Sequence, residues 1–299
     1  MTIVCVVDGT FELFRCFFGA PPRQRPDGVE VGATRALVST LLSLLRESDV
    51  THVGVAFDTV IESFRNTLFA GYKTGDGIDP NLHAQFPLVE QATRALGLVT
   101  WSMIDFECDD ALATMAVRAA ADERVRQVRI CSPDKDLTQV VQGSRIVCVD
   151  RIRKTTLDED GVRAKFGVPP SAIADLLALV GDEADGVPGL PGFGMKSAAN
   201  LLRHYGCLEA IPEGPWPTAL KLRGADGLAA TLAAHRGEAA LYKQLTTLVT
   251  TVALPTSVDD LRWCGPDNTL LEALAVTLDD ASVVERVQAA WLAHPNHAR

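Results

Sequence analysis

Nine carboxylates are grouped in short clusters along this 299-residue chain, and several directly follow apolar runs that are typical of β-strands. Asp8 follows the run 3–7, Asp58 follows 53–57, and Asp134 comes soon after 128–131. Ligands bind beyond the carboxyl ends of the strands in an open parallel sheet, so acids from distant segments should converge on one edge. The nine acids are Asp8, Asp58, Glu107, Asp109, Asp110, Asp134, Asp136, Asp182 and Asp185.

Such a convergence of negative charge requires cations. Two carboxylates about 4 Å apart repel by roughly 4 kcal/mol at an effective dielectric constant of about 20. Oxygen ligands without His or Cys suit hard ions such as Mg²⁺ or Mn²⁺, and a set this large can hold two or more, as in many nucleases and polymerases. A single strand-end Asp more commonly caps a helix or starts a turn. For nine acids together, metal binding is the better interpretation.

Three short motifs carry most of these acids. In FECDD, Glu107 and Asp110 are three residues apart at a predicted helix start, where they could also simply complement the helix dipole. In SPDKDL, an extended loop would turn both aspartates to one side and Lys135 away from them. In GDEAD, Asp182 and Asp185 are again three apart, just after a predicted helix. Each motif alone is common, but their combination predicts a metal site.

A glycine-rich turn precedes a predicted helix at 196–205. Backbone N–H groups at a helix N-terminus can hold a phosphate, and a lysine there adds charge. The same turn is also an ordinary connection between two helices, and the lysine followed by a serine favours the phosphate. The residues concerned are Gly189, Gly192, Gly194, Lys196 and Ser197.

The composition is that of a folded protein with reduced thiols. At 47% apolar residues, the chain can bury the core of one large domain or of two closely associated parts. Seven cysteines without CxxC spacing, with Cys5, Cys131 and Cys148 in apolar runs, favour core thiols over disulfides or zinc. No run approaches 18 apolar residues and no basic leader precedes residue 3, so neither a membrane span nor a signal peptide is expected, and the protein should be cytoplasmic.

The net charge of −10 does not exclude a nucleic acid partner. Without the nine clustered acids, 29 acidic residues remain against 28 basic ones. Divalent ions bound at the cluster would cancel part of the negative charge of these nine acids. A DNA or RNA substrate therefore remains compatible with the composition.

The order of predicted elements indicates an α/β part followed by a helical part. Strands are predicted at 3–7, 53–57, 98–101, 128–131 and 146–149, and helices at 33–45, 88–96, 109–121 and from about Leu137. The polar segment 59–87 should be an exposed, mobile excursion. Helices are then predicted at 171–180, 196–205 with a stop at Gly206, 270–278 and 283–292.

These motifs occur in the order and spacing of the 5′-nuclease family, which the chain resembles over roughly residues 1–250. That family includes bacterial and phage flap endonucleases and the N-terminal 5′→3′ exonuclease domain of bacterial DNA polymerase I. The matching segments are VVDGTFELFR, VAFDTVIESFR, GYK, FECDDALA, SPDKDLTQ and GDEADGVPGLPGFGMKSA.

The resemblance implies an α/β fold with a PIN-like, mostly parallel sheet flanked by helices and a helical arch. It places this core at 1–168, with the arch at about 60–90. A C-terminal all-helical part at 169–299 would carry a helix-three-turn-helix DNA-binding element at about 171–206, with a K⁺ ion as a further expectation there. In this reading, the glycine-rich turn and its helix belong to the DNA-binding element.

The resemblance also implies two metal groups and several basic contacts. One group would contain Asp8, Asp58, Glu107, Asp109 and Asp134, and the other Asp110, Asp136, Asp182 and Asp185, with sharing between them. Lys73 resembles the lysine at the arch base that contacts the scissile phosphate, and Arg15 and Arg65 match further basic positions. No acid of the family's set is missing.

The implied activity is Mg²⁺- or Mn²⁺-dependent, structure-selective hydrolysis of DNA phosphodiesters, as 5′→3′ exonuclease and flap endonuclease, in replication or repair. Expected partners are 5′ flaps, nicks and 5′ ends of duplex DNA, together with a DNA polymerase or other repair proteins. A monomer without a membrane association is expected.

Two positions depart from the family pattern. Asp76 stands where an arginine usually follows the arch lysine, and Gly186 stands where GDxxDNxPG has asparagine. An acid on the phosphate path would weaken threading of a single strand, so the preference between flap and exonucleolytic cleavage stays open.

Three other functions compete with this one. A non-catalytic DNA-junction binding protein of the same fold would be expected to lack site acids. A PIN-type ribonuclease would not explain the segment GLPGFGMKS. A haloacid dehalogenase phosphatase would need a second aspartate where Thr10 stands.

Overall fold

The computed structural model describes residues 2–297, and these form two compact units. The first, called the sheet unit here, comprises residues 2–61, 75–132 and 250–297. The second, called the helical unit, comprises residues 62–74 and 133–249. The chain therefore leaves the sheet unit twice, first for a short segment and then for a long one.

The sheet unit is built on four parallel strands in the order β3-β2-β1-β4. Their bounds are β1 Thr2–Asp8, β2 His52–Asp58, β3 Val99–Met103 and β4 Val125–Cys131. The four strands predicted in this region are confirmed. Asp8 and Asp58 are the last residues of two neighbouring strands, with Asp8 in register with Ala56, so their carboxylates belong to the same sheet edge, as predicted.

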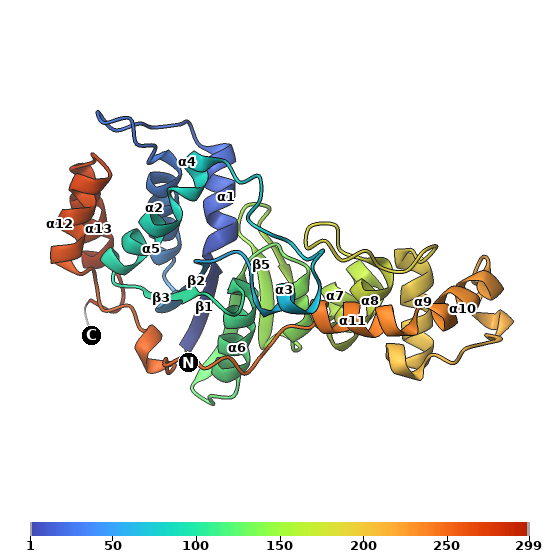
Figure 1. The fold of residues 1–299 in the computed structure, drawn as a ribbon. Coiled ribbons are helices and arrows are strands. Elements are labelled where there is room, and N and C mark those ends of the chain that lie inside the picture. Colours follow the sequence, from blue (N-terminus) through green and yellow to red (C-terminus); the bar gives the residue numbers. More distant parts are fainter. Residues whose placement is uncertain (1, 298–299) are drawn as a thin grey trace. The chain divides into compact units, whose positions relative to one another are not determined.

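Both faces of this sheet are covered, which explains why β1 is apolar without interruption. Ile3, Cys5 and Val7 belong to a large core cluster with the helices α1, α2, α5, α12 and α13, while Val4 and Val6 are fully buried outside that cluster. Helix α6 packs against β1, β2, β3 and β4, and α12 and α13 pack on α5 and α2 (Figure 1). The helix bounds are α1 Gly9–Gly19, α2 Gly32–Leu45, α4 Pro80–His83, α5 Phe86–Ala95, α6 Cys108–Ala120, α12 Asn268–Thr277 and α13 Ser282–Leu292, with a 3₁₀ turn η5 at Asp259–Leu261.

The helical unit contains a small antiparallel pair, β5 and β6, and is otherwise helical. Helix α11 packs along α8, and α9 also contacts α8. The bounds are β5 Ile146–Asp150, β6 Thr155–Leu157, α3 Phe64–Leu68, α7 Glu159–Phe166, α8 Ile173–Val180, α9 Met195–Tyr205, α10 Ala225–Ala234 and α11 Arg236–Thr246. Short 3₁₀ turns are η1 Asp136–Val140, η2 Pro170–Ala172, η3 Leu208–Ala210 and η4 Thr218–Leu220.

Several elements differ from the sequence-based expectation. Segment 59–87 is not simply an exposed excursion, because it contains α3 and α4 and buries Arg65, Tyr72 and Leu82. The helix expected from about Leu137 is only the five-residue turn η1. Helix α1 was not predicted, and it starts because the Asp8 carboxylate accepts the Phe11 N–H at 2.8 Å.

The predicted placement of three thiols in the core is confirmed, since Cys5, Cys131 and Cys148 are buried. A search of the helices within residues 2–297 found none with both the length and the apolar character needed to cross a membrane.

An ion-pair cluster joins α2 and α13 in the sheet unit and predicts a pH-dependent contribution to stability. The Asp280 carboxylate lies 3.1 Å from Arg35 and 2.9 Å from Arg286, and it accepts the Ser282 hydroxyl at 2.6 Å. Burial alone would raise the pKa of Asp280, but Ser282 and the two guanidinium groups lower it below its ordinary value.

Asp280→Asn should therefore lower the free energy of unfolding near neutral pH by about 1–3 kcal/mol, since it removes charge-assisted hydrogen bonds. A carboxylate with a lowered pKa stabilises the fold above its ordinary pKa of about 3.9, and this contribution is lost as the pH falls below that value. Urea unfolding across the acid range measures the effect, with the exposed neighbour Asp279→Asn as control. A difference that stays constant down to low pH would contradict the assignment.

Candidate metal centre

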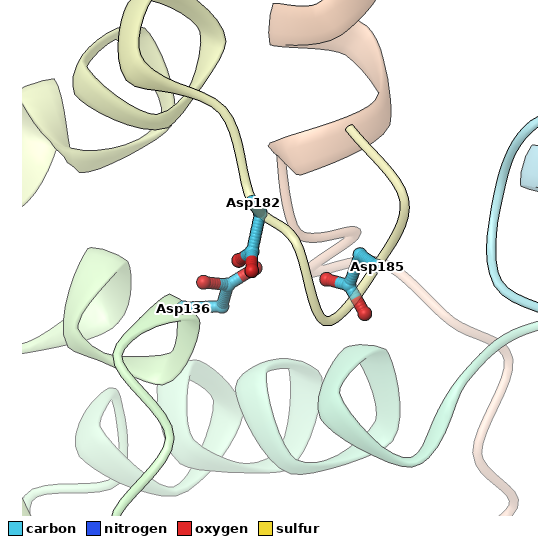
Figure 2. Close-up of side chains that lie close together, drawn as sticks. All are labelled: Asp136, Asp182 and Asp185. Carbon is cyan, nitrogen blue, oxygen red and sulfur yellow. The ribbon is translucent and has the colours of Figure 1, made fainter. Parts of the chain in front are cut away.

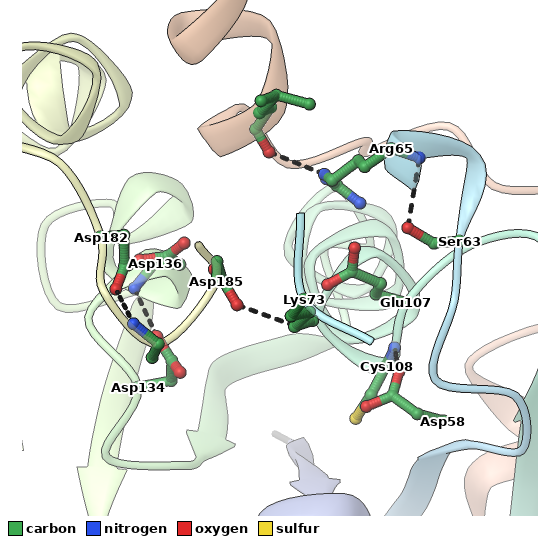
Figure 3. Close-up of polar contacts among 12 residues, drawn as sticks. Asp58, Ser63, Arg65, Lys73, Glu107, Cys108, Asp134, Asp136, Asp182 and Asp185 are labelled. Carbon is green, nitrogen blue, oxygen red and sulfur yellow. Dashed lines mark hydrogen bonds and ion pairs between the residues drawn. The ribbon is translucent and has the colours of Figure 1, made fainter. Parts of the chain in front are cut away.

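The sheet unit places two acids where neighbouring strands end. Asp8 and Asp58 are buried, 5% and 8% exposed. Asp8 accepts the Phe11 N–H and the Ser132 hydroxyl, each at 2.8 Å. Asp58 accepts the Cys108 N–H at 2.7 Å (Figure 3). Both carboxylates are thus held by short hydrogen bonds at the sheet edge.

The acids of FECDD lie at the start of α6. Glu107 is the N-cap, and its backbone N–H donates to the Asp110 carboxylate at 3.1 Å in a capping box. Glu107 and Asp110 are buried, and Asp109 is partly exposed. The helix-capping interpretation is therefore correct for this pair, and it brings the acids to the element that also contacts Asp58.

Three residues that were not predicted as site residues position these acids. Ser132 directly follows β4 and binds Asp8, and the Thr10 hydroxyl accepts the Asp58 N–H at 2.8 Å. The Cys108 thiol lies 3.5 Å from Asp8, and burial together with the charges of Asp8, Asp58 and Asp109 raises its pKa well above the ordinary value. Ser132 lies at the carboxyl end of a strand, as Asp8 does, so this position was the signal that could have found it.

The helical unit brings together Asp136, Asp182 and Asp185. Each offers a carboxylate oxygen within 4.8 Å of the others, and the three are called the acid triad here (Figure 2). Asp136 and Asp182 are 6% and 5% exposed. Asp136 Oδ1 and Asp182 Oδ2 are buried, and the nearby charge that faces both of them is the Lys135 ammonium. Burial, and then the charges of Asp134, Asp185 and Asp182, raise the pKa of Asp136, whereas Lys135 lowers it.

Lys135 does not point away from the aspartates, so that prediction is wrong. Its ammonium lies 2.5 Å from Asp182 Oδ2 and 3.8 Å from Asp136 Oδ1. The reason is that the backbone at Lys135 is helical, not extended, and η1 begins at the next residue, with the Asp136 N–H donating to Asp134 Oδ1 at 2.8 Å. Burial would lower the pKa of Lys135, but Asp182, Asp136 and Asp134 raise it overall, so the side chain stays charged.

The loop that carries Asp182 and Asp185 is closed by backbone pairing. Asp182 and Val187 exchange both backbone hydrogen bonds, each at 2.8 Å. Gly181 and Gly189 have φ of +91° and +68°, and a Cβ on Gly189 would lie 2.3 Å from the Gly181 nitrogen. This GDEADGVPG loop therefore depends on glycine, and it lines an open cleft of about 450 Å³ beside Asp182.

Lys73 is bound to the same loop. Its backbone N–H donates to the Asp185 carbonyl at 3.0 Å, and its ammonium lies 3.0 Å from Asp185 Oδ1 (Figure 3). The Asn66 side chain donates to the Lys73 carbonyl at 2.9 Å. Segment 62–74 thus reaches the acid triad through Lys73, within the helical unit.

Gly186 has a structural reason for its departure from the family pattern. Its φ is +72°, a value that asparagine tolerates, but a Cβ would lie 2.2 Å from the Gly71 carbonyl oxygen. The absence of a side chain lets segment 62–74 approach the triad loop this closely.

Gly186→Asn should therefore destabilise the protein by about 1–3 kcal/mol, the typical cost of inserting atoms into a well-packed site. Thermal unfolding measures the effect. Gly194→Ala is the matched control, because Gly194 has no atom within 4 Å of a Cβ and no positive φ. Equal melting temperatures for Gly186→Asn and the wild-type protein would contradict the proposed close packing.

The two arginines predicted as phosphate contacts make intramolecular contacts. Arg65 is 2% exposed, and its guanidinium donates to the carbonyls of Leu245 and Thr247 at 2.7 and 3.0 Å, at the end of α11. Arg15 pairs with Glu12 at 2.5 Å and donates to the Thr40 hydroxyl at 2.9 Å. Their contact with a phosphate stays a prediction.

The glycine-rich turn leads into α9 as predicted. Gly192, Gly194 and Lys196 are exposed. The Ser197 hydroxyl caps the helix, since it contacts the N–H and carbonyl of Gly194 at 3.1 and 2.9 Å. Ser197 therefore shapes the turn, and Gly194 with Lys196 remain open to solvent.

The donor set of the acid triad fits a hard divalent cation. All of its ligand atoms are carboxylate oxygens, and the burial of closely spaced carboxylates is costly unless cations contact them. The residues that would hold such an ion are Asp136, Asp182 and Asp185, with Asp134 beside them.

Two family models together match residues 3–269. The model for the 5′-3′ exonuclease N-terminal resolvase-like domain matches residues 3–167, and that for the 5′-3′ exonuclease C-terminal SAM fold matches 168–269. These matches confirm the predicted fold class of a mostly parallel sheet with flanking helices and a helical C-terminal part.

Curated relatives and a solved structure agree with the models. DNA polymerase I of Pseudomonas aeruginosa is 38% identical over 278 residues, which is 90% of this chain and 30% of that protein. The chain thus spans about a third of the length of the DNA polymerase I relatives. A 5′-3′ exonuclease of Aquifex aeolicus is 29% identical over 96% of both chains.

The fold resembles that of a bacteriophage T5 flap endonuclease variant in a pseudo-enzyme-product complex with DNA and metal ions. The TM-score is 0.66 at 19% identity, covering 97% of this chain and 98% of that one. This likeness supports the fold, and the family models extend over most of the sequence. The chain belongs to the 5′-3′ exonuclease family.

Proposed function

We propose that this protein is a metal-dependent, structure-selective 5′ nuclease that hydrolyses DNA phosphodiesters, as 5′→3′ exonuclease and flap endonuclease, in replication or repair. The observation that carries the proposal is the acid triad, in which three carboxylates converge and two of them, Asp136 and Asp182, are buried. Family membership supplies the reaction class, and the triad supplies a feature that a merely structural domain would not need.

In this proposal, the helical unit binds a divalent ion through Asp136, Asp182 and Asp185, with Asp134 in support. The acids of the sheet unit, Asp8, Asp58, Glu107, Asp109 and Asp110, bind at least one more. Mg²⁺ and Mn²⁺ suit oxygen-only ligands. A K⁺ ion at the helix-three-turn-helix element remains part of the proposal as an implication of the family resemblance.

Bound divalent ions would supply Lewis-acid stabilisation of a phosphodiester during in-line hydrolysis. The chain's own residues bind and orient. Short hydrogen bonds from Ser132 and Cys108 fix the carboxylates of Asp8 and Asp58. Lys73, 27% exposed on its side chain beside Asp185, is the cation proposed to contact the scissile phosphate. Arg15 and Arg65 are proposed as secondary phosphate contacts.

Duplex DNA is proposed to bind at the turn before α9. Gly192, Gly194 and Lys196 are exposed at the N-terminus of this 11-residue helix, where backbone N–H groups and the lysine favour a phosphate. Gly189 shapes the turn and Ser197 caps the helix. The proposed substrates are 5′ flaps, nicks and 5′ ends of duplex DNA, and a DNA polymerase is a proposed partner. A cytoplasmic monomer is proposed.

A non-catalytic DNA-junction binding protein is the main alternative. It would have no use for buried, closely spaced acids, which cost stability. All nine acids of the predicted set are present, and five of them are 6% exposed or less. The nuclease is therefore the better supported function.

The test is incubation of a labelled 5′-flap duplex and a labelled blunt duplex with the wild-type protein and Asp134→Asn, in Mg²⁺ or in EDTA. We expect products from the wild-type protein in Mg²⁺ only, and at least about tenfold less product from the variant. Cleavage in EDTA would refute the metal dependence. Degradation of the blunt duplex with intact flaps would refute the flap endonuclease part alone.

A further inference from the structure

We propose that Lys135 is a resident counter-cation of the acid triad, which holds Asp136 and Asp182 together in the metal-free protein and competes with the divalent ion. This inference rests on the proposed metal function of the triad. The motif SPDKDL led us to expect that Lys135 points away from the aspartates. The inference instead assigns to Lys135 a positioning role that sets the metal affinity of the triad.

The first support is the identity of the oxygens that Lys135 faces. Asp182 Oδ1 accepts the Ala184 N–H at 3.2 Å, which leaves Oδ2 to the ammonium at 2.5 Å. Asp136 Oδ1 lies 3.8 Å from the same ammonium. Both oxygens are buried, and the Lys135 ammonium faces them both. Lys135 and an incoming cation would therefore use the same oxygens.

The second support is the charge balance within the helical unit. Three carboxylates within 4.8 Å of one another face two ammonium groups, those of Lys135 and Lys73. Lys73 pairs with Asp185, and Lys135 is the ammonium that lies beside both Asp136 and Asp182. Without it, the two buried acids would repel each other at short range. A divalent ion that arrives while Lys135 is in place would be repelled in turn.

The third support is that Lys135 has a route out. Its side chain is 36% exposed, whereas those of Asp182 and Asp136 are 4% and 8% exposed. A lysine stem has four rotatable carbon segments, so the ammonium can move to solvent while the backbone of η1 stays in place. The side chain of Lys73 is less exposed, at 27%. Lys135 is thus the lysine with the more open route to solvent.

The experiment is a Mn²⁺ titration by calorimetry, combined with melting temperatures in EDTA and in Mn²⁺, for the wild-type protein and Lys135→Met. The binding step that disappears in Asp182→Asn is assigned to the triad. We expect Lys135→Met to bind Mn²⁺ in this step about fivefold more tightly, the upper range for a partly exposed ion pair. In EDTA the variant should melt at a lower temperature than the wild-type protein, and saturating Mn²⁺ should abolish the difference.

Two further variants separate charge from other effects. Lys135→Arg keeps the charge and should stay close to the wild-type affinity. Lys165→Met removes one positive charge from the same unit, at an exposed position on α7, and should change neither affinity nor melting temperature. Unchanged or weaker Mn²⁺ binding by Lys135→Met would overturn the competition. Absence of Mn²⁺ binding by the wild-type protein would overturn the proposed function as well.

A measurement on the wild-type protein keeps the inference testable if Lys135→Met fails to fold. Reductive methylation of lysines, read by mass spectrometry, should modify Lys135 faster in saturating Mn²⁺ than in EDTA, because the ion displaces the ammonium into solvent. Lys165 serves as the internal reference. Equal or slower modification of Lys135 in Mn²⁺ would overturn the inference.

Discussion

Asp182→Asn should reduce Mg²⁺-dependent cleavage of a 5′-flap DNA by roughly 100-fold or more, because even changes around the ligands of a metal cost about 10–100-fold. Asp182 is 5% exposed, and its Oδ2 is a buried oxygen of the triad that faces Lys135. An amide in its place cannot offer two anionic oxygens. Single-turnover cleavage over a range of Mg²⁺ concentrations measures the loss, which should be only partly recovered at high Mg²⁺.

Glu183→Gln is the matched control for this variant. Glu183 is the next residue in the same loop and is exposed, and it does not belong to the triad. The Glu183→Gln variant should cleave the flap DNA at close to the wild-type rate. Comparable losses in both variants would mean that the charge of the loop matters and not the triad. Circular dichroism and melting temperature in EDTA establish that Asp182→Asn is folded.

Lys73→Met should lower kcat/KM for the same substrate by roughly 100-fold, a typical loss when one group that stabilises transition-state charge is removed. The ammonium is 3.0 Å from Asp185 and partly exposed, so it is near the proposed metal site and accessible to a phosphate. The triad acids remain, and Mn²⁺ affinity should not fall. A large loss of cleavage with intact metal binding is therefore the expected signature.

If Lys73 only holds segment 62–74 on the triad loop, a different result is expected for Lys73→Met. In that case the melting temperature would fall, and Lys73→Arg, which keeps the ion pair with Asp185, would restore both stability and cleavage fully. If Lys73→Met cleaves within about threefold of the wild-type protein, the phosphate contact is wrong. Lys165→Met controls for the loss of one positive charge in the same unit.

Strand and helix periodicity was enough to predict most of the framework. The strands ending at Asp8 and Asp58 and the helix starting beside Asp109 were identified because buried parallel strands are apolar throughout and helix starts attract acids. Short elements such as η1 and α3 were missed or misread. They are too short for a hydrophobic period, and they form because Asp134, Ser63 and Arg65 make hydrogen bonds with the backbone.

The candidate site was predictable in its residue types and less so in its contacts. That acids would collect at the carboxyl ends of strands follows from parallel topology, which the sequence determined by itself. The orientation of Lys135 depended on one pair of backbone dihedral angles, and the sequence pattern indicated the wrong one. The burial of Arg65 depended on α11, about 180 residues away in the chain.

The sequence by itself identified the family to which the chain belongs and predicted an acidic set of nine carboxylates, because residue type and spacing are local properties. Tertiary structure alone decided how charge is compensated in the helical unit. It placed Asp136 beside Asp182 and Asp185, closed the loop through glycines with positive φ, and brought Lys73 and Lys135 to the acids. The physical reason is that ion pairing among buried groups depends on distances between residues far apart in the chain, which periodicity does not encode.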